Sequence, residues 1–341
     1  MTKTDDRRRL QMADVARMAG VSVSTVSRAL NGSTLINNAT RERIAALAQS
    51  LNYTINLGAK NLRMQRNQTI AVVIPYDATS RQHISDPFFL AMLGSLADAV
   101  TERGYDLLLS RVDASKLDSA ARFYDSGLAL GVVLIGQWHH HDQLNQMAAR
   151  NVPIVVWGAQ MPQQLYCSVG GDNVLGGQLV AEHFLTLGRK RILFMGDTQL
   201  PEVAQRYEGF RHALQNANVP EIKELKLTVP FDVGVARTAL TQLLGKRVAF
   251  DAVFGCSDLL AMTALQVLRE RGHRVPQDVA VAGYDDMALA SYCDPPLTSV
   301  HQPIQDAAVA LIDALLTILD GQSAAPRVLP VSLMTRQSTV A

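Results

Sequence analysis

The sequence predicts an α/β protein with a small helical domain at its N-terminus and a larger body of two lobes with parallel sheets. Two observations predict this architecture. Residues 12–31 show the pattern of two short helices around a tight turn, and from Thr69 short apolar segments alternate with amphipathic ones in two successive series. The chain has 341 residues, of which 48% are apolar, which is enough for two or three sizeable cores.

The first domain, residues 1–54, is expected to consist of packed helices. Apolar residues recur at helical spacing up to Ala19, Gly20 interrupts the pattern, and Ser22 can cap the second helix. Another helix follows Asn37, which we expect to be its N-cap. The faces that would pack together carry Met12, Val15, Ala16, Val26, Ala29, Leu30, Ile44, Leu47, Ala48 and Leu51. Two short helices on a tight turn are typical of a helix-turn-helix unit.

The outward face of the second helix is mostly polar. With 3.6 residues per turn, it carries Val23, Ser24, Ser27, Arg28 and Asn31. In a helix-turn-helix unit this face meets the base edges in the major groove, so we expect these residues to bind double-stranded DNA. Arg28 could donate two hydrogen bonds to one guanine. The alternative for Arg28 is a solvated arginine on an exposed face.

The charges are divided unevenly along the chain. Residues 1–66 hold 11 basic and 4 acidic side chains, a net charge of +7, whereas the remaining residues sum to −6. A basic domain attracts DNA phosphates and an acidic body is repelled by them. We therefore expect DNA affinity to fall steeply with salt.

Residues 55–68 are expected to form a linker between the head and the body. The segment is polar and basic, with Ala59 and Leu62 as its main apolar members. An exposed leucine on a basic segment is explained if it inserts between base pairs in the minor groove. The alternative is that Leu62 packs on the body.

The body, residues 69–341, alternates strands and helices in a pattern typical of parallel sheets covered on both faces. The expected strands are 70–74, 107–110, 132–135 and 154–157 in the first series, and 191–195, 225–229, 252–254 and 279–283 in the second. We expect the first lobe to span about 69–165 and 295–325, and the second about 166–294 and 326–341. Ligands of such sheets bind beyond the carboxyl ends of the strands, which predicts a cleft between the lobes.

Several kinds of site and segment are not expected. The N-terminus is polar, and no run of 18 apolar residues follows, so we expect neither a signal peptide nor a membrane partner and place the protein in the cytoplasm. The widely spaced cysteines Cys167, Cys256 and Cys293 suggest ordinary buried thiols rather than a disulfide framework. Adjacent histidines such as those at 139–141 do not converge on one ion, so we expect no metal. We find no catalytic motif or cofactor motif, and therefore expect no enzyme.

Four stretches of the chain closely resemble the lactose-repressor (LacI/GalR) family of bacterial transcription regulators. They are DVARMAGVSVSTVSRALN with TRERI within residues 14–44, VGGDNVLGG at 169–177, RYEGF at 206–210, and VAGYDDMALASYCDPPLTSVHQP at 281–303. The resemblance implies a helix-turn-helix head, a hinge helix and a two-lobed core similar to periplasmic sugar-binding proteins. It also implies a homodimer that binds a palindromic operator.

Carried over by position, the resemblance gives roles to residues of the head and the linker. Val23, Ser24 and Arg28 match the positions that read bases. Asn56, Ala59 and Leu62 match the hinge helix that contacts DNA. Many relatives have proline before this asparagine, where this chain has Ile55, so the start of the hinge helix is less sharply defined.

The resemblance also implies an effector site in the cleft. Its residues would be Phe88, Phe89, Arg206, Phe231, Asp258 and Asp285. Aromatic faces and charged hydrogen-bonding groups suit a sugar-like effector. The alternatives are that Phe88 belongs to the core, that Asp285 caps a helix beginning near Met287, and that Arg206 forms a structural ion pair.

The function expected from these observations is a dimeric repressor of genes for carbohydrate uptake or breakdown, controlled allosterically by a small sugar. One alternative is a sugar-binding or transport protein without a DNA function, which the basic head disfavours. A second is a doubly wound enzyme, for which the chain lacks a catalytic motif. A third is a purine-type corepressor, which would use the same aromatic pair and Arg206.

Overall fold

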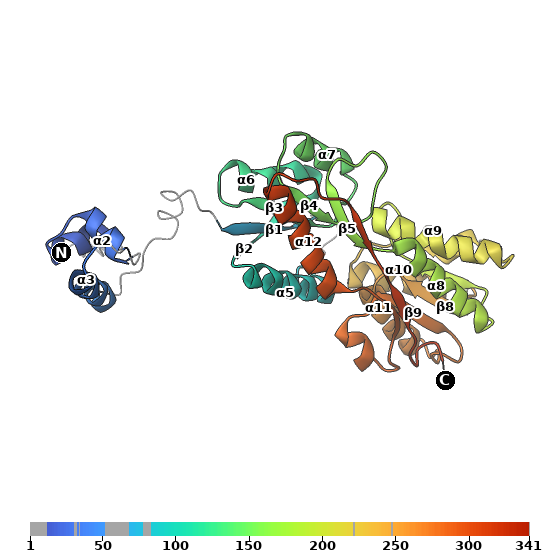
Figure 1. Cartoon of the computed structure of the whole chain (residues 1–341). Coiled ribbons are helices and arrows are strands. Elements are labelled where there is room, and N and C mark those ends of the chain that lie inside the picture. Colours follow the sequence, from blue (N-terminus) through green and yellow to red (C-terminus); the bar gives the residue numbers. More distant parts are fainter. Residues whose placement is uncertain are drawn as a thin grey trace, which may run out of the picture. The chain divides into compact units, whose positions relative to one another are not determined.

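The computed structural model describes residues 12–30, 33, 35–51, 68–77, 83–220, 222–246 and 248–340. The chain divides into two compact units, a head within residues 1–67 and a body of residues 68–341, and each is considered by itself. Figure 1 shows the helical head and the α/β body.

The described part of the head consists of three helices. They are α1 (Met12–Ala19), α2 (Val23–Leu30) and α3 (Asn38–Ser50). Ser22 caps α2 through a 3.1 Å bond from the Thr25 N–H to its hydroxyl, and Asn37 caps α3 through a 2.8 Å bond from the Thr40 N–H. The predicted caps and helices are thus confirmed. The buried core comprises Val15, Ala16, Ala19, Val26, Ala29 and Ile44.

The first lobe of the body is built on a parallel sheet. Its described strands run in the order β11-β5-β4-β3-β1-β2. They are β1 (Thr69–Tyr76), β2 (Asp106–Asp113), β3 (Gly131–Ile135), β4 (Ile154–Trp157), β5 (Cys167–Gly171) and β11 (Arg327–Leu329). One apolar cluster joins the sheet to α5 (Pro87–Glu102) and α12 (Ile304–Leu319). Another joins it to η1 (Ala114–Ala121), α6 (Arg122–Asp125) and α7 (His141–Ala149).

The second lobe repeats this plan, with described strands in the order β12-β10-β9-β8-β6-β7. They are β6 (Ile192–Met195), β7 (Lys226–Leu227), β8 (Ala252–Gly255), β9 (Ala280–Asp285), β10 (Thr298–His301) and β12 (Ser332–Met334). Only β12 among them pairs antiparallel. The helical segments are α8 (Asn173–Thr186), α9 (Pro201–Asn216), η2 (Lys223–Leu225), α10 (Val233–Gly245), α11 (Asp258–Glu270) and η3 (Ala288–Tyr292).

The boundaries predicted for the lobes need correction. The segments 167–171 and 327–329 pair within the first sheet, and the segment 298–301 pairs within the second. The first lobe therefore comprises residues 68–171 and 304–329, and the second comprises 172–303 and 332–340. Short apolar segments do not reveal which sheet they join, because both sheets bury the same kinds of side chain.

Two glycines bring α8 and α9 into backbone contact. A Cβ atom on Gly177 would lie 1.8 Å from the carbonyl oxygen of Arg206, and one on Gly209 would lie 1.8 Å from that of Val174. Both distances are far below any van der Waals contact, so only glycine permits this approach. The close crossing sets the position of Arg206 on α9.

Candidate functional site

A cavity of about 690 Å³, including its open mouth, lies between the two lobes. It is formed beyond the carboxyl ends of strands from both sheets, as predicted for a doubly wound protein. Its lining comes from α5 and the ends of β3 and β4 in the first lobe, and from α9 and the segments around Phe231, Ser257 and Asp285 in the second.

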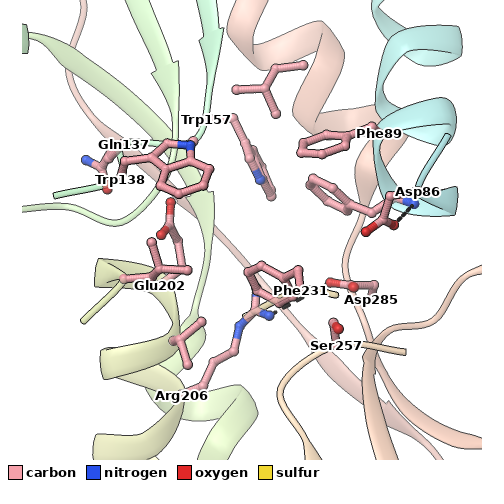
Figure 2. A pocket seen from close by; sticks show the side chains of 15 residues that line it. Asp86, Phe89, Gln137, Trp138, Trp157, Glu202, Arg206, Phe231, Ser257 and Asp285 are labelled. Atoms are coloured by element: carbon pink, nitrogen blue, oxygen red, sulfur yellow. Dashed lines mark hydrogen bonds and ion pairs between the residues drawn. The ribbon is translucent and has the colours of Figure 1, made fainter. Parts of the chain in front are cut away.

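Aromatic side chains from both lobes face this cavity. Figure 2 shows Trp138, Trp157 and Phe89 on one side of it and Phe231 on the other. Phe88 completes the aromatic lining among the described residues, with its ring centroid 6.4 Å from that of Trp157. Such flat apolar surfaces can stack on the C–H faces of a sugar ring.

Arg206 lies at the floor of the cavity and is buried, with 7% of its surface exposed. Its Nε donates to Asn173 Oδ1 at 2.9 Å, and its Nη1 donates to the carbonyl oxygen of Cys256. The guanidinium carbon lies 3.6 Å from the centroid of the Tyr284 ring, a cation–π contact. Nη1 also lies 3.9 Å from the carboxylate of Asp285.

Asp285 forms the other half of this buried pair. Its backbone φ of 109° is rare for a residue with a side chain, which is typical of strained functional positions. Gln302 donates a 2.8 Å hydrogen bond to its carboxylate. Burial raises the pKa of Asp285 well above its ordinary value, although Arg206 opposes this effect.

Two further carboxyl groups line the cavity. Asp86 is the N-cap of α5 and accepts a 3.0 Å hydrogen bond from the Phe88 N–H. Glu202 lies in the first turn of α9, and its carboxylate lies near the backbone N–H of Gln137 in the first lobe. Enclosure raises the pKa of Glu202, while this N–H and Arg206 lower it.

Further hydrogen bonds join α9 and its approach to the first lobe. His139 Nδ1 lies 3.0 Å from the carbonyl oxygen of Gln199, and Gln205 Nε2 donates to that of Gln160 at 3.3 Å. These contacts hold the lobes together at one edge of the cavity.

The structure brings together five of the six predicted effector residues. Phe88, Phe89, Arg206, Phe231 and Asp285 line the cavity. Their role in binding an effector stays a prediction. The alternative that Asp285 caps a helix is wrong, because the following 3-10 helix begins at Ala288 without a side-chain cap. The ion pair considered for Arg206 is present and lies within the cavity.

Asp258 is the exception, and its predicted position in the site is wrong. It is 1% exposed and does not line the cavity. Its carboxylate accepts from the Met287 N–H at 2.7 Å and from the Ser299 hydroxyl, which ties α11 to the segments after β9 and within β10. Burial raises its pKa to about 7. Ser257, one residue earlier, lines the cavity instead.

Several lining residues were not identified from the sequence. Those with polar or aromatic side chains are Asp86, Gln137, Trp138, Trp157, Glu202 and Ser257. Most of these residues directly follow or end a predicted strand, or neighbour a predicted site residue. The rule that parallel sheets bind ligands at their carboxyl ends could therefore have found Trp138, Trp157 and Ser257.

The outward face of α2 is accessible in the head. Val23 is 38% exposed, Ser24 and Arg28 are exposed, and Ser27 is partly buried. Ser24 shares a 2.8 Å hydrogen bond with the Ser22 hydroxyl. The exposure is consistent with contact to DNA, which stays a prediction. The other predicted DNA-binding residues, Asn31, Asn56, Ala59 and Leu62, lie outside the described residues.

The comparisons with known proteins agree with this architecture. A model described as bacterial regulatory proteins, lacI family, matches residues 11–56, and one described as a periplasmic binding protein-like domain matches residues 181–339. The HTH-type transcriptional regulator CelR of Thermobifida fusca is 33% identical over 97% of this chain and 99% of that protein. The chain belongs to the LacI family. It is therefore a DNA-binding transcription regulator and not an enzyme.

Other relatives of this LacI-family regulator carry related names. The ribose operon repressor of Escherichia coli (strain K12) is 30% identical over 89% of this chain and 92% of that protein. A solved CelR–cellobiose complex matches with a TM-score of 0.72 and 31% identity, covering 97% of this chain and all of that one. A Lac repressor dimer bound to operator and an anti-inducer shares the fold, with a TM-score of 0.83 and 24% identity over 98% and 100%.

None of the helices in the described part of the chain is long and apolar enough to cross a membrane. The described residues also contain no group of three or more histidine, cysteine or acidic side chains arranged to hold a metal ion.

Proposed function

We propose that this LacI-family regulator represses genes for carbohydrate uptake or breakdown, and that a sugar bound in the cleft controls its operator affinity. The observation that carries the proposal is the lining of the cleft. Aromatic rings from both lobes face a buried Arg206–Asp285 pair, which combines stacking surfaces with strong directional hydrogen-bonding groups. The solved complex of the relative CelR with cellobiose supports a sugar as ligand.

The two lobes provide a physical route for this control. A sugar that contacts both lobes stabilises one relative arrangement of them and shifts the equilibrium by its differential affinity. The linker at residues 55–68 leads directly into β1 of the first lobe, so a change in the position of that lobe can act on the linker. A change of linker geometry would then alter the spacing of the heads.

The DNA-bound form is proposed to be a homodimer on a palindromic operator in the bacterial cytoplasm. Two copies of α2 would enter successive major grooves, with Val23, Ser24, Ser27, Arg28 and Asn31 toward the bases. Asn56, Ala59 and Leu62 would contact the minor groove between the half-sites. The Lac repressor dimer bound to operator, which shares this fold, supports the proposal of a dimer on DNA.

Two measurements on the full-length protein test the proposal. A melting-temperature screen with neutral mono- and disaccharides should find sugars that raise the midpoint, because a ligand of the native state stabilises it by mass action. Anisotropy with DNA from upstream of the gene should then show operator affinity changing with the same sugars. Stabilisation by hypoxanthine or guanine instead of any sugar would favour the purine alternative. Absence of any preferred duplex at low salt would refute the proposal.

A further inference from the structure

Acidic side chains outnumber basic ones among the described residues that line the cleft. Among the described residues that line it, Asp86, Glu202 and Asp285 are acidic and Arg206 alone is basic. Figure 2 shows Asp86 and Glu202 on opposite sides of the cavity, so a ligand at its centre lies between them.

Arg206 is poorly placed to neutralise an incoming anion. Two of its three guanidinium nitrogens already donate to Asn173 and to the carbonyl oxygen of Cys256, and Nη1 also faces Asp285. Tight binding of a carboxylate or phosphate by arginine usually uses two parallel N–H groups of one fork. An anion that bound the Nη1–Nη2 side of this guanidinium would compete with Cys256 and Asp285 for Nη1.

Glu202 is held in a defined position at the cavity wall. Its carboxylate lies near the backbone N–H of Gln137 in the other lobe, and Arg206 lies one helical turn further along α9. Enclosure of Glu202 already disfavours its negative charge. A second negative charge inside the same cavity would add direct repulsion in a poorly screened space.

We infer that the effector of this cleft carries no negative charge, and that Glu202 is the residue that excludes anionic sugars. This inference rests on the proposed function and narrows it. Uronic acids and sugar phosphates are excluded, whereas the hydroxyl groups of an uncharged sugar can donate to Asp86, Glu202 and Asp285. The aromatic rings then supply the apolar contact.

The inference is tested by calorimetry and melting curves on the full-length protein at pH 7.5 and constant ionic strength. The probes are the neutral sugar that gives the largest melting shift, its uronic acid, and the corresponding uronamide. The uronamide matches the acid in size and lacks its charge. We expect the uronamide to bind within about threefold of the neutral sugar and the acid at least about tenfold more weakly.

Two variants locate the charge effect. Glu202→Gln keeps the shape of the side chain and removes its charge. It should therefore reduce the ratio between the affinities for the uronamide and for the acid by about tenfold. Glu208→Gln alters an exposed glutamate on the same helix and should leave this ratio unchanged. Melting curves without ligand check that both variants fold.

The outcomes separate the inference from the proposed function. If the acid binds as well as the uronamide, or if both bind equally poorly, charge selection is refuted while a sugar effector stands. If the wild type rejects the acid and Glu202→Gln does not relieve this, Glu202 is not the selecting residue. If neither sugars nor their derivatives bind, the proposed function fails and the inference fails with it.

Discussion

Arg206 connects groups from four parts of the second lobe. Besides belonging to α9, it contacts Asn173 at the start of α8, the backbone after β8, and Tyr284 and Asp285 at the end of β9. These contacts need a planar group with several fixed donors, which lysine does not have. Arg206 therefore stabilises the lobe and also shapes the floor of the cleft.

Arg206→Lys should weaken both properties. A single ammonium group cannot make the bonds to Asn173 and Cys256 and also stack on Tyr284, so we expect a loss of about 1–3 kcal/mol in unfolding free energy. The affinity for the sugar should fall at least about tenfold. Chemical denaturation and ligand titration measure the two effects. Arg237→Lys, at an exposed ion pair with Glu270, is the control and should change little. An unchanged sugar response would contradict the assignment.

Asp258 predicts a pH dependence of stability. Its pKa is raised by burial to about 7, whereas in the unfolded chain it is near 4. Between these values the folded protein holds a proton that the unfolded chain releases, so the free energy of unfolding should decrease as pH rises from about 4 to 7.

Asp258→Asn removes this titration and can keep hydrogen bonds to both Met287 and Ser299. We expect the variant to show a flatter profile of unfolding free energy between pH 4 and 7. Part of the slope should remain, because Asp285 also has a raised pKa. Denaturation series at several pH values provide the measurement. Parallel profiles for the wild type and the variant would show that Asp258 does not titrate in this range.

At the scale of elements, the crossing of α8 and α9 determines where Arg206 lies. Gly177 and Gly209 occur in the stretches VGGDNVLGG and RYEGF that carry the family resemblance. Each of these glycines lets its helix approach a backbone carbonyl oxygen of the other helix. The crossing also places Asn173 Oδ1 within hydrogen-bond distance of Arg206 Nε.

Gly209→Ala should force the two helices apart. The added carbon would lie 1.8 Å from the Val174 carbonyl oxygen, so we expect a loss of about 3 kcal/mol and a weaker sugar response. Gly94→Ala is a matched control inside α5, where an added carbon meets nothing within 4 Å. It should stabilise the protein by about 0.5–1 kcal/mol. Equal effects of the two changes in equilibrium denaturation would contradict this account of the crossing.

At the scale of the whole molecule, charge separates the two tasks of the chain. The first 66 residues carry +7 and the remainder −6, so attraction to DNA is confined to the head and its linker. Affinity for any duplex should therefore fall steeply as salt rises. Discrimination between duplexes depends instead on individual side chains of α2.

Arg28→Ala is expected to reduce discrimination between duplexes while it changes the affinity for random DNA little. Loss of a paired contact to guanine should reduce the preference for the operator by about 1–3 kcal/mol, while binding to random DNA keeps nearly the same salt dependence. Anisotropy with both duplexes over a range of salt gives the two quantities. Arg43→Ala, at an exposed position of α3, should leave the preference intact. A preference that survives Arg28→Ala would refute the base contact.

The sequence by itself determined the helices of the head, their caps at Ser22 and Asn37, and the two series of strands and helices. These features depend on local spacing and on short-range hydrogen bonds, which a sequence displays directly. The family resemblance added Phe88, Phe89, Arg206, Phe231 and Asp285 as neighbours in one cleft.

Only the tertiary structure decided which strands join which sheet and which side chains face the cavity. β5 and β10 are short and largely buried, whereas β11 is short and largely exposed, and the pairing of all three depends on long-range contacts. Ser257 and Asp258 are adjacent, yet the serine faces the cavity and the aspartate binds Met287 within the protein. At a turn after a strand, consecutive side chains point in different directions, and packing alone selects the one that reaches the ligand.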